Sequence, residues 1–147
     1  MTDPRDFDAL WNYNDPAETE SRFRELLPIV EKSGDASYCA QLLTQIARAQ
    51  GLQRQFDAAH QTLDTVESML TDDLKIAHVR YLLERGRVFN SSKHPAEARP
   101  LFLQAWELAQ AVGEDGYAVD AAHMIAIVET SEQALIWNLK ALDYRFY

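Results

Sequence analysis

The chain has 147 residues, of which 47% are hydrophobic and 25% charged, a composition typical of a folded domain with one continuous core. Its formal net charge of −9 argues against binding to nucleic acid or to an anionic membrane, because both depend on basic residues. The acidic N-terminus does not resemble a signal peptide and no apolar stretch reaches the length of a membrane span, so we expect a cytoplasmic protein.

Helix-start and helix-stop residues divide the sequence into about seven helices, which predicts an all-α fold. Asp3-Pro4 is expected to open a short helix that ends near Trp11, because an aspartate caps a helix and a proline fits its first turn. Pro28 and Pro100 fall inside longer helices and are expected to bend them or to break the hydrogen-bond ladder locally, with curvature imposed by packing favoured over a hinge. The expected longer helices are 16–32, 36–52, 55–70, 74–91, 95–112, 117–129 and 132–144.

Small and apolar residues recur along the chain at fixed offsets. Ala47 and Gly86 are 39 residues apart, and Ala126 follows Gly86 by 40. Helical segments repeating at such a period are typical of an array of stacked helical hairpins. Small residues let paired helices approach closely, and larger ones fill the gaps between hairpins. The small positions are Ala47, Ala59, Gly86, Ala98, Ala126 and Ala134, and the larger ones are Phe56, Leu63, Phe89 and Phe102.

This pattern resembles the tetratricopeptide repeat over about residues 16–141. The resemblance implies one domain, a right-handed superhelical array of hairpins that binds other proteins. The period of 39 to 40 residues is longer than the family's usual value of about 34, and Arg85 occupies a usually apolar site. The expected units are an N-terminal partial repeat or cap (1–34), two repeats (35–71 and 72–113) and a shortened third repeat (114–147).

By this resemblance, the first helix of each hairpin lines a concave groove, which is the expected binding surface. Arg48, Arg80 and Arg87 would face it, and guanidinium groups bind carboxylates bidentately, so an acidic peptide or protein segment is the expected kind of partner. Glu84 lies on the same helix face, and the alternative is that it pairs with these arginines and leaves a neutral surface. The expected lining residues are Gln41, Thr44, Arg48, Arg80, Leu83, Arg87, Asn90, Asp120, His123 and Ile127.

The C-terminal helix offers a second candidate surface. A terminal repeat normally presents a polar outer face, whereas this helix is rich in leucine and runs into an aromatic end. One interpretation is self-association, as in a homodimer; the other is that the aromatic residues fold back onto the preceding helix. The residues expected to take part in self-association are Trp137, Tyr144, Phe146 and Tyr147.

The sequence contains no recognisable catalytic, metal-binding or cofactor-binding constellation. The four histidines stand in no metal-binding spacing, and Cys39 has no neighbouring basic residue that would activate its thiol. The favoured hypothesis is therefore non-catalytic protein binding in the groove. A structural or oligomerisation module is the second hypothesis, a regulatory domain that senses a small ligand is the third, and an enzyme is the least favoured.

Overall fold

The computed structural model describes residues 6–145, with side chains for residues 6–143, and this part of the chain is helical as the sequence predicts. The predicted short helix is the 3-10 helix η1, and each longer helix begins and ends within two residues of its predicted bounds. The elements are η1 (Phe7–Leu10), α1 (Pro16–Lys32), α2 (Ala36–Leu52), α3 (Phe56–Met69), α4 (Lys75–Ser91), α5 (Pro95–Ala111), α6 (Asp115–Val128) and α7 (Ser131–Arg145).

Local sequence signals explain where the first two α-helices begin. The side chains of Asp15 and Asp35 each accept a 3.1 Å hydrogen bond from the backbone N–H three residues later, which caps α1 and α2. Both internal prolines lie inside helices, as the sequence predicts. Helix α1 continues through Pro28 and α5 through Pro100, so neither residue ends the helix that contains it.

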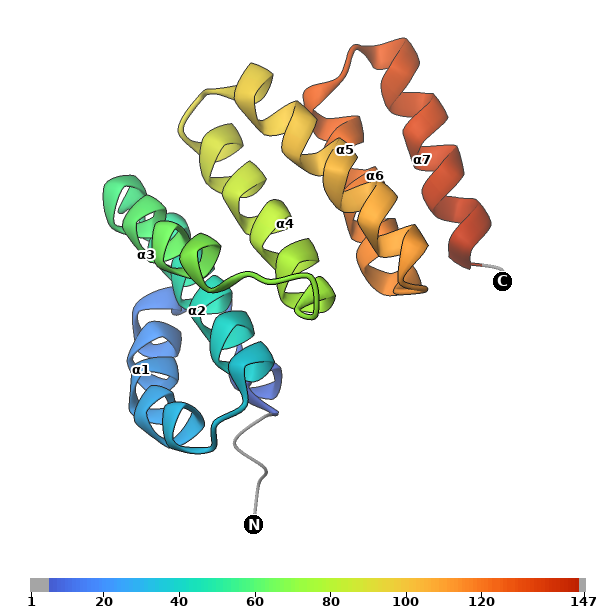
Figure 1. Cartoon of the computed structure of the whole chain (residues 1–147). Helices are drawn as coiled ribbons and strands as arrows, with labels where there is room; N and C mark the ends of the chain where they lie inside the picture. The colour runs from blue at the N-terminus through green and yellow to red at the C-terminus, as the bar shows by residue number, and fades with distance from the viewer. Residues whose placement is uncertain (1–5, 146–147) are drawn as a thin grey trace.

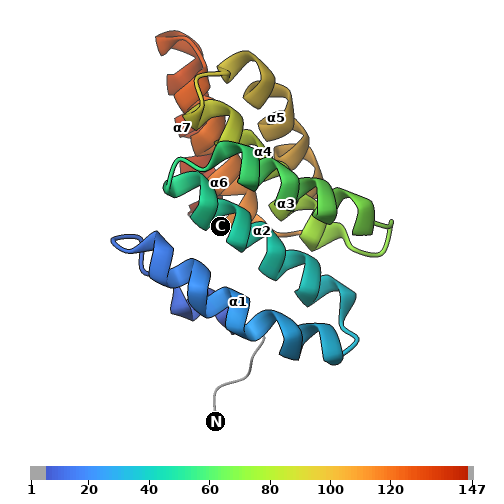
Figure 2. The ribbon, with the colours of Figure 1, turned by 90° about the vertical axis from the view of Figure 1, so that its left-hand side faces the viewer.

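The α-helices form an array with an inner and an outer layer. Each helix packs against the next along the chain, and Figure 2 shows α1, α2 and α3 stacked in alternating directions. In addition, α2 contacts α4 and α4 contacts α6, whereas α1, α3, α5 and α7 make no comparable contacts with one another. The array therefore curves with α2, α4 and α6 on its concave side, and Figure 1 shows the bent outline that results.

The small residues of the repeat lie where helices approach most closely. A Cβ atom on Gly86 of α4 would lie 2.7 Å from Cδ1 of Phe102 on α5, so this crossing has no room for a larger residue. Phe102 is itself fully buried and fills the space that the glycine leaves. Ala47, Ala59 and Ala98 are fully buried, Ala126 is buried and Ala134 is half-buried.

The N-terminal segment completes the first hairpin. Phe7 of η1 is 1% exposed and packs edge-on against Phe23 of α1. With Val30, Leu42 and Ile46 these rings form a separate apolar cluster between η1, α1 and α2. The short η1 thus closes the apolar side of the hairpin formed by α1 and α2.

Candidate functional site

The N-terminal end of the concave face is filled by the chain's own N-terminal segment. Arg80 is 6% exposed and donates two hydrogen bonds to Asp8, at 2.7 Å and 2.9 Å, and one of 3.2 Å to Gln41. Its guanidinium group lies 5.6 Å from the ring centroids of both Phe7 and Tyr117. Burial alone would lower the pKa of Arg80, but the hydrogen-bonded Asp8 holds it above its ordinary value. Arg80 and Gln41 are therefore engaged within the chain and do not face an open groove.

A second polar cluster lies at the centre of the concave face, around Glu84. This residue is 3% exposed, and its Oε2 accepts hydrogen bonds from Gln45 Nε2 at 3.1 Å and from Arg87 Nη1 at 2.9 Å. Arg87 also pairs with Asp120 on α6. Burial alone would lower the pKa of Arg87, but Glu84 and Asp120 hold it above its ordinary value. The charge of Arg87 is thus balanced inside the protein.

Arg48 on α2 is held differently from the other two groove arginines. Its Nε lies 3.9 Å from Glu84 Oε1, an ion-pair distance that is too long for a hydrogen bond. Its guanidinium carbon lies 5.6 Å from the Trp11 ring and 5.0 Å from the Tyr13 ring, which stack on each other. No hydrogen bond joins the Arg48 guanidinium to any residue that the structure describes, and the buried Oε1 of Glu84 accepts none. Arg48 therefore keeps its donors available.

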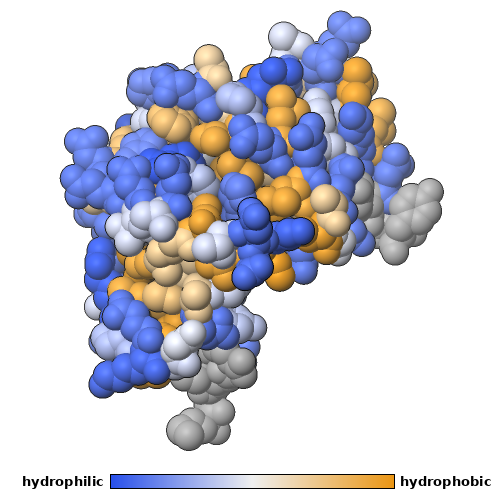
Figure 3. Space-filling model, in the orientation of Figure 1, coloured by the Kyte–Doolittle hydropathy of each residue, from blue (hydrophilic) through white to orange (hydrophobic). Residues whose placement is uncertain are grey.

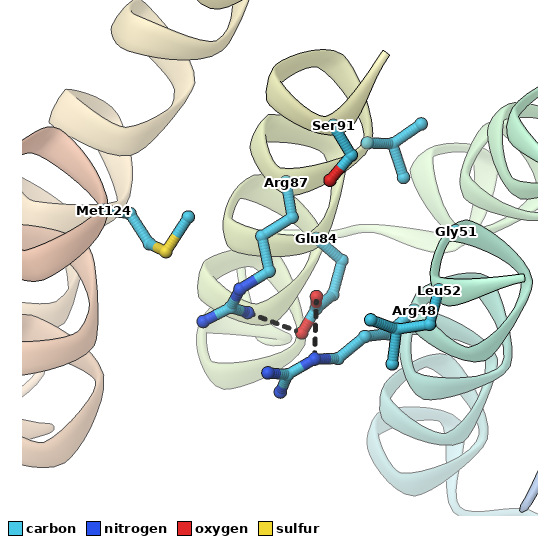
Figure 4. Close-up of a pocket in the computed structure, with 8 residues that line it drawn as sticks. Arg48, Gly51, Leu52, Glu84, Arg87, Ser91 and Met124 are labelled. Atoms are coloured by element: carbon cyan, nitrogen blue, oxygen red, sulfur yellow. Dashed lines mark hydrogen bonds and ion pairs between the residues drawn. The ribbon is translucent and has the colours of Figure 1, made fainter. Parts of the chain in front are cut away.

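A cavity of about 150 Å³ opens beside Arg48, between α2, α4 and α6. Figure 4 shows the side chains of Arg48 and Arg87 extending side by side toward the space in front of α6, with Met124 on the opposite wall. The site thus combines an apolar lining with charged groups at its edge. Its apolar residues are Leu52, Val88 and Met124, and its charged residues are Arg48, Glu84 and Arg87.

The remaining residues expected to line the groove divide into buried and accessible ones. Thr44 is fully buried and Leu83 is 1% exposed, because α2 and α4 pack directly against each other at this level. Neither can touch a partner. Asn90 is half-buried, whereas His123 and Ile127 are exposed on α6, the latter by 62%. The accessible part of the expected groove is therefore its C-terminal half.

Several residues of this face were missed in the sequence. Gln45 is 1% exposed and joins α2 to α4, and it lies 39 positions before its partner Glu84. Gln41 and Arg80 are bonded across the same spacing of 39. Polar pairs separated by the repeat period are thus a signal that could have identified this network. No such signal marks Asp8, because η1 has only four residues and belongs to no full repeat.

Four large apolar residues are exposed in the described part of α7, whereas the tryptophan of this helix is engaged within the chain. Trp137 packs edge-on against Trp106 of α5, with 5.3 Å between ring centroids, and the Lys140 ammonium lies 4.2 Å from its ring. Apolar surface is visible over α7 at the right of Figure 3. Tyr144 is described by its backbone alone, and Phe146 and Tyr147 lie outside the described residues. The exposed apolar residues of α7 are Leu135, Ile136, Leu139 and Leu142, at 62%, 42%, 52% and 43%.

The chemistry-bearing side chains of the described region are dispersed. No group of three His, Cys, Asp or Glu residues in residues 6–143 is arranged to hold a metal ion. Partial burial and the nearby Glu31 raise the pKa of the Cys39 thiol, which keeps it protonated at neutral pH. No helix in the described part of the chain is long and apolar enough to cross a membrane.

Comparisons with protein-family models, with curated proteins and with solved structures found no match to this chain. The geometry of the concave face is therefore the basis for assigning a function.

Proposed function

We propose that this protein binds a segment of another protein on its concave face, in the cavity between α2, α4 and α6, and that it catalyses no reaction. One observation carries the proposal: apolar walls and a guanidinium with open donors meet at an accessible hollow of the inner layer. Exposed Ile127 extends this apolar surface, because it lies three residues beyond Met124 on the same face of α6.

The size of the cavity favours a protein segment over a small ligand. Pockets for small molecules usually measure about 300–1,000 Å³, whereas this cavity measures about 150 Å³. An apolar cavity of about that volume holds one benzene-sized group, which corresponds to a single apolar side chain. At this cavity the volume therefore favours a side chain of a protein partner over a whole small ligand.

The family assignment and the location remain part of the proposal. Buried small residues at the repeat period and a concave inner layer support a tetratricopeptide-like array. We further propose that the protein acts in the cytoplasm, where its partially buried Cys39 would stay reduced.

The experiment selects peptides that bind the wild-type protein from a random peptide-display library. The affinity of the selected peptides is then measured for wild type and for a variant whose cavity is filled. Gly51 lines the cavity, and a Cβ atom there would meet only Val88 Cγ2 at 3.5 Å, an ordinary contact. Gly51→Leu should therefore fill the cavity without disturbing α2. Gly116→Leu is the matched control, because a Cβ atom at Gly116 has no neighbour within 4 Å.

Selected peptides are expected to bind Gly51→Leu at least about tenfold more weakly than wild type, and to bind Gly116→Leu as tightly as wild type. If no peptide is enriched, or if the enriched peptides bind all three proteins equally, the concave cavity is not a peptide-binding site.

The exposed face of α7 supports a second candidate function, self-association. Leu135, Leu139 and Leu142 are spaced four and three residues apart, so they share one helix face. Sedimentation velocity should detect a dimer that Leu139→Lys dissociates. Ile29→Lys is the matched control, because Ile29 is an exposed apolar residue of α1 with a similar exposure of 51%. A monomeric wild type would exclude this function.

A further inference from the structure

We propose that the bound segment carries an acidic residue next to an apolar one, with its carboxylate on Arg48 and its apolar side chain in the cavity. This inference rests on the proposed function and specifies the chemistry of the partner. Three features of the concave face support it: the free donors of Arg48, the way the chain binds its own N-terminal segment, and the distribution of charge around the cavity.

The first feature is that Arg48 is preorganised and unsatisfied. Trp11 and Tyr13 lie against its guanidinium, and Trp11 is in turn fixed by a 3.0 Å hydrogen bond from its Nε1 to Gln45 Oε1. The end of the Arg48 side chain points away from Glu84 in Figure 4. Its two terminal nitrogens can therefore receive a carboxylate in a bidentate pair, with little loss of side-chain entropy.

The second feature is that a neighbouring arginine of the concave face, Arg80, already binds an acidic residue of the chain itself, next to a buried apolar one. Phe7 is buried to 1% exposure, and the adjacent Asp8 forms a bidentate pair with Arg80. The cavity also sets a guanidinium beside an apolar seat, with Arg48 as the guanidinium and Leu52, Val88 and Met124 as the seat, whereas Phe7 is seated between η1, α1 and α2. A partner segment with adjacent acidic and apolar residues would match both the guanidinium of Arg48 and the apolar seat of the cavity.

The third feature is the charge at the edge of the cavity. A basic residue of a partner would meet two guanidinium groups, those of Arg48 and Arg87. Oε2 of Glu84 is already shared between Gln45 and Arg87, and its Oε1 is buried and lies 3.9 Å from Arg48 Nε. The three groove arginines are formally balanced by Asp8, Glu84 and Asp120. The preference for a carboxylate therefore comes from open hydrogen-bond donors at short range and not from an excess of positive charge.

The test is an NMR titration with three capped tetrapeptides that differ at one position: acetyl-Gly-Leu-Asp-Gly-amide and its Asn and Lys counterparts. Capping removes the terminal charges, so the third side chain is the one charge that varies. Amide signals of Gly51, Leu52 and Ser91 report occupation of the cavity, which these residues line. The titrations are run on wild type, on Arg48→Met, which keeps the aliphatic stem, and on Arg22→Met, a matched control at an exposed arginine of α1.

We expect the Asp peptide to shift these signals. Wild type should bind it at least about tenfold more tightly than the Asn peptide, and should bind the Lys peptide most weakly. This ratio should fall to about one in Arg48→Met and stay unchanged in Arg22→Met. Equal binding of the Asp and Asn peptides to wild type, or a ratio that survives in Arg48→Met, overturns the inference. If the tetrapeptides shift no cavity signal although library peptides bind there, the inference fails and the proposed function stands. If neither binds, both fail.

Discussion

Gln45 and Glu84 form a 3.1 Å hydrogen bond across the inner layer, and they occupy equivalent positions in successive hairpins, 39 residues apart. Gln41 and Arg80 repeat this relationship one turn earlier on the same two helices. Polar residues that would line an open groove are thus used to fix α2 against α4 over one helical turn, from Gln41 to Gln45. The proposed binding surface lies where this network ends, at Arg48 and the cavity.

Glu84→Ala is expected to destabilise the fold by about 3 kcal/mol, because removal of one partner leaves buried charge and donors unpaired. Arg87 would keep only Asp120, and the Nε2 group of Gln45 would keep only the 3.2 Å hydrogen bond to Thr44. The measurement is urea-induced unfolding followed by circular dichroism.

The comparison for this variant is Glu18→Ala, which breaks the exposed ion pair between Glu18 and Arg22 on α1. Exposed pairs of this kind contribute about 0.5 kcal/mol or less. Equal effects of the two substitutions would mean that the Glu84 network is as solvated as the surface of α1 and does not hold α2 and α4 together.

Asp8→Asn is expected to cost about 1–3 kcal/mol of stability, because the Arg80 charge, which is 6% exposed, would lose its carboxylate partner. The same unfolding assay applies. In a protein that already carries Arg80→Met, Asp8→Asn should lower the unfolding free energy much less. The difference is the coupling energy between Asp8 and Arg80, which we expect to be about 1–2 kcal/mol. Additive effects would contradict the view that this pair anchors the N-terminal segment.

The fold could be predicted from the sequence because its signals are local or periodic. The aspartates that cap α1 and α2 lie directly before the helices they begin, and the small residues Ala47 and Gly86 recur at the repeat period. These signals specify helix bounds and close approaches without any knowledge of tertiary contacts. The array of hairpins and its inner layer follow from them.

The state of the candidate site could not be predicted in the same way. Arg48, Arg80 and Arg87 look alike in the sequence, yet they are held differently. Within the described residues, the Arg48 guanidinium makes one long ion pair and no hydrogen bond, Arg80 is held by Asp8 from 72 positions away, and Arg87 is shared by two carboxylates. Charge counting gives the sign of a surface but not the pairing of its residues. Which arginine remains available depends on where η1 lies, and four residues carry no periodicity that would locate them.

Gly86→Ala is expected to destabilise the fold by about 1–3 kcal/mol, because the new methyl group would overlap the ring of Phe102 at the crossing of α4 and α5. Alanine at an open helical position normally has the opposite effect, since glycine costs about 1 kcal/mol there. Gly116→Ala on α6 is therefore the matched control and should be neutral or stabilising in the same unfolding assay. A stabilising Gly86→Ala would show that Phe102 can move aside.

A polar cluster on the outer side of α4 provides a prediction about pH. Arg85 donates hydrogen bonds to Asp64 and His60 of α3 at 2.6 Å and 2.8 Å. An arginine is only a donor, so His60 Nδ1 must accept and the ring must be neutral. Burial, and then the charge of Arg85, lower the pKa of His60 below its ordinary value of 6.5.

Because the folded-state pKa of His60 is lowered, the unfolded chain binds the extra proton first as the pH falls below about 6.5. The stability that neutral His60 contributes is therefore complete above about pH 6.5, and it is lost progressively as the pH falls toward the lower folded-state pKa. The unfolding free energy is measured at about pH 7.5 and about pH 5.5. Its decrease between the two should be smaller in His60→Asn than in wild type, because the Asn Oδ1 can still accept a hydrogen bond from Arg85 but does not titrate. An equal loss in both proteins would mean that His60 takes up its proton equally well in the folded and unfolded states.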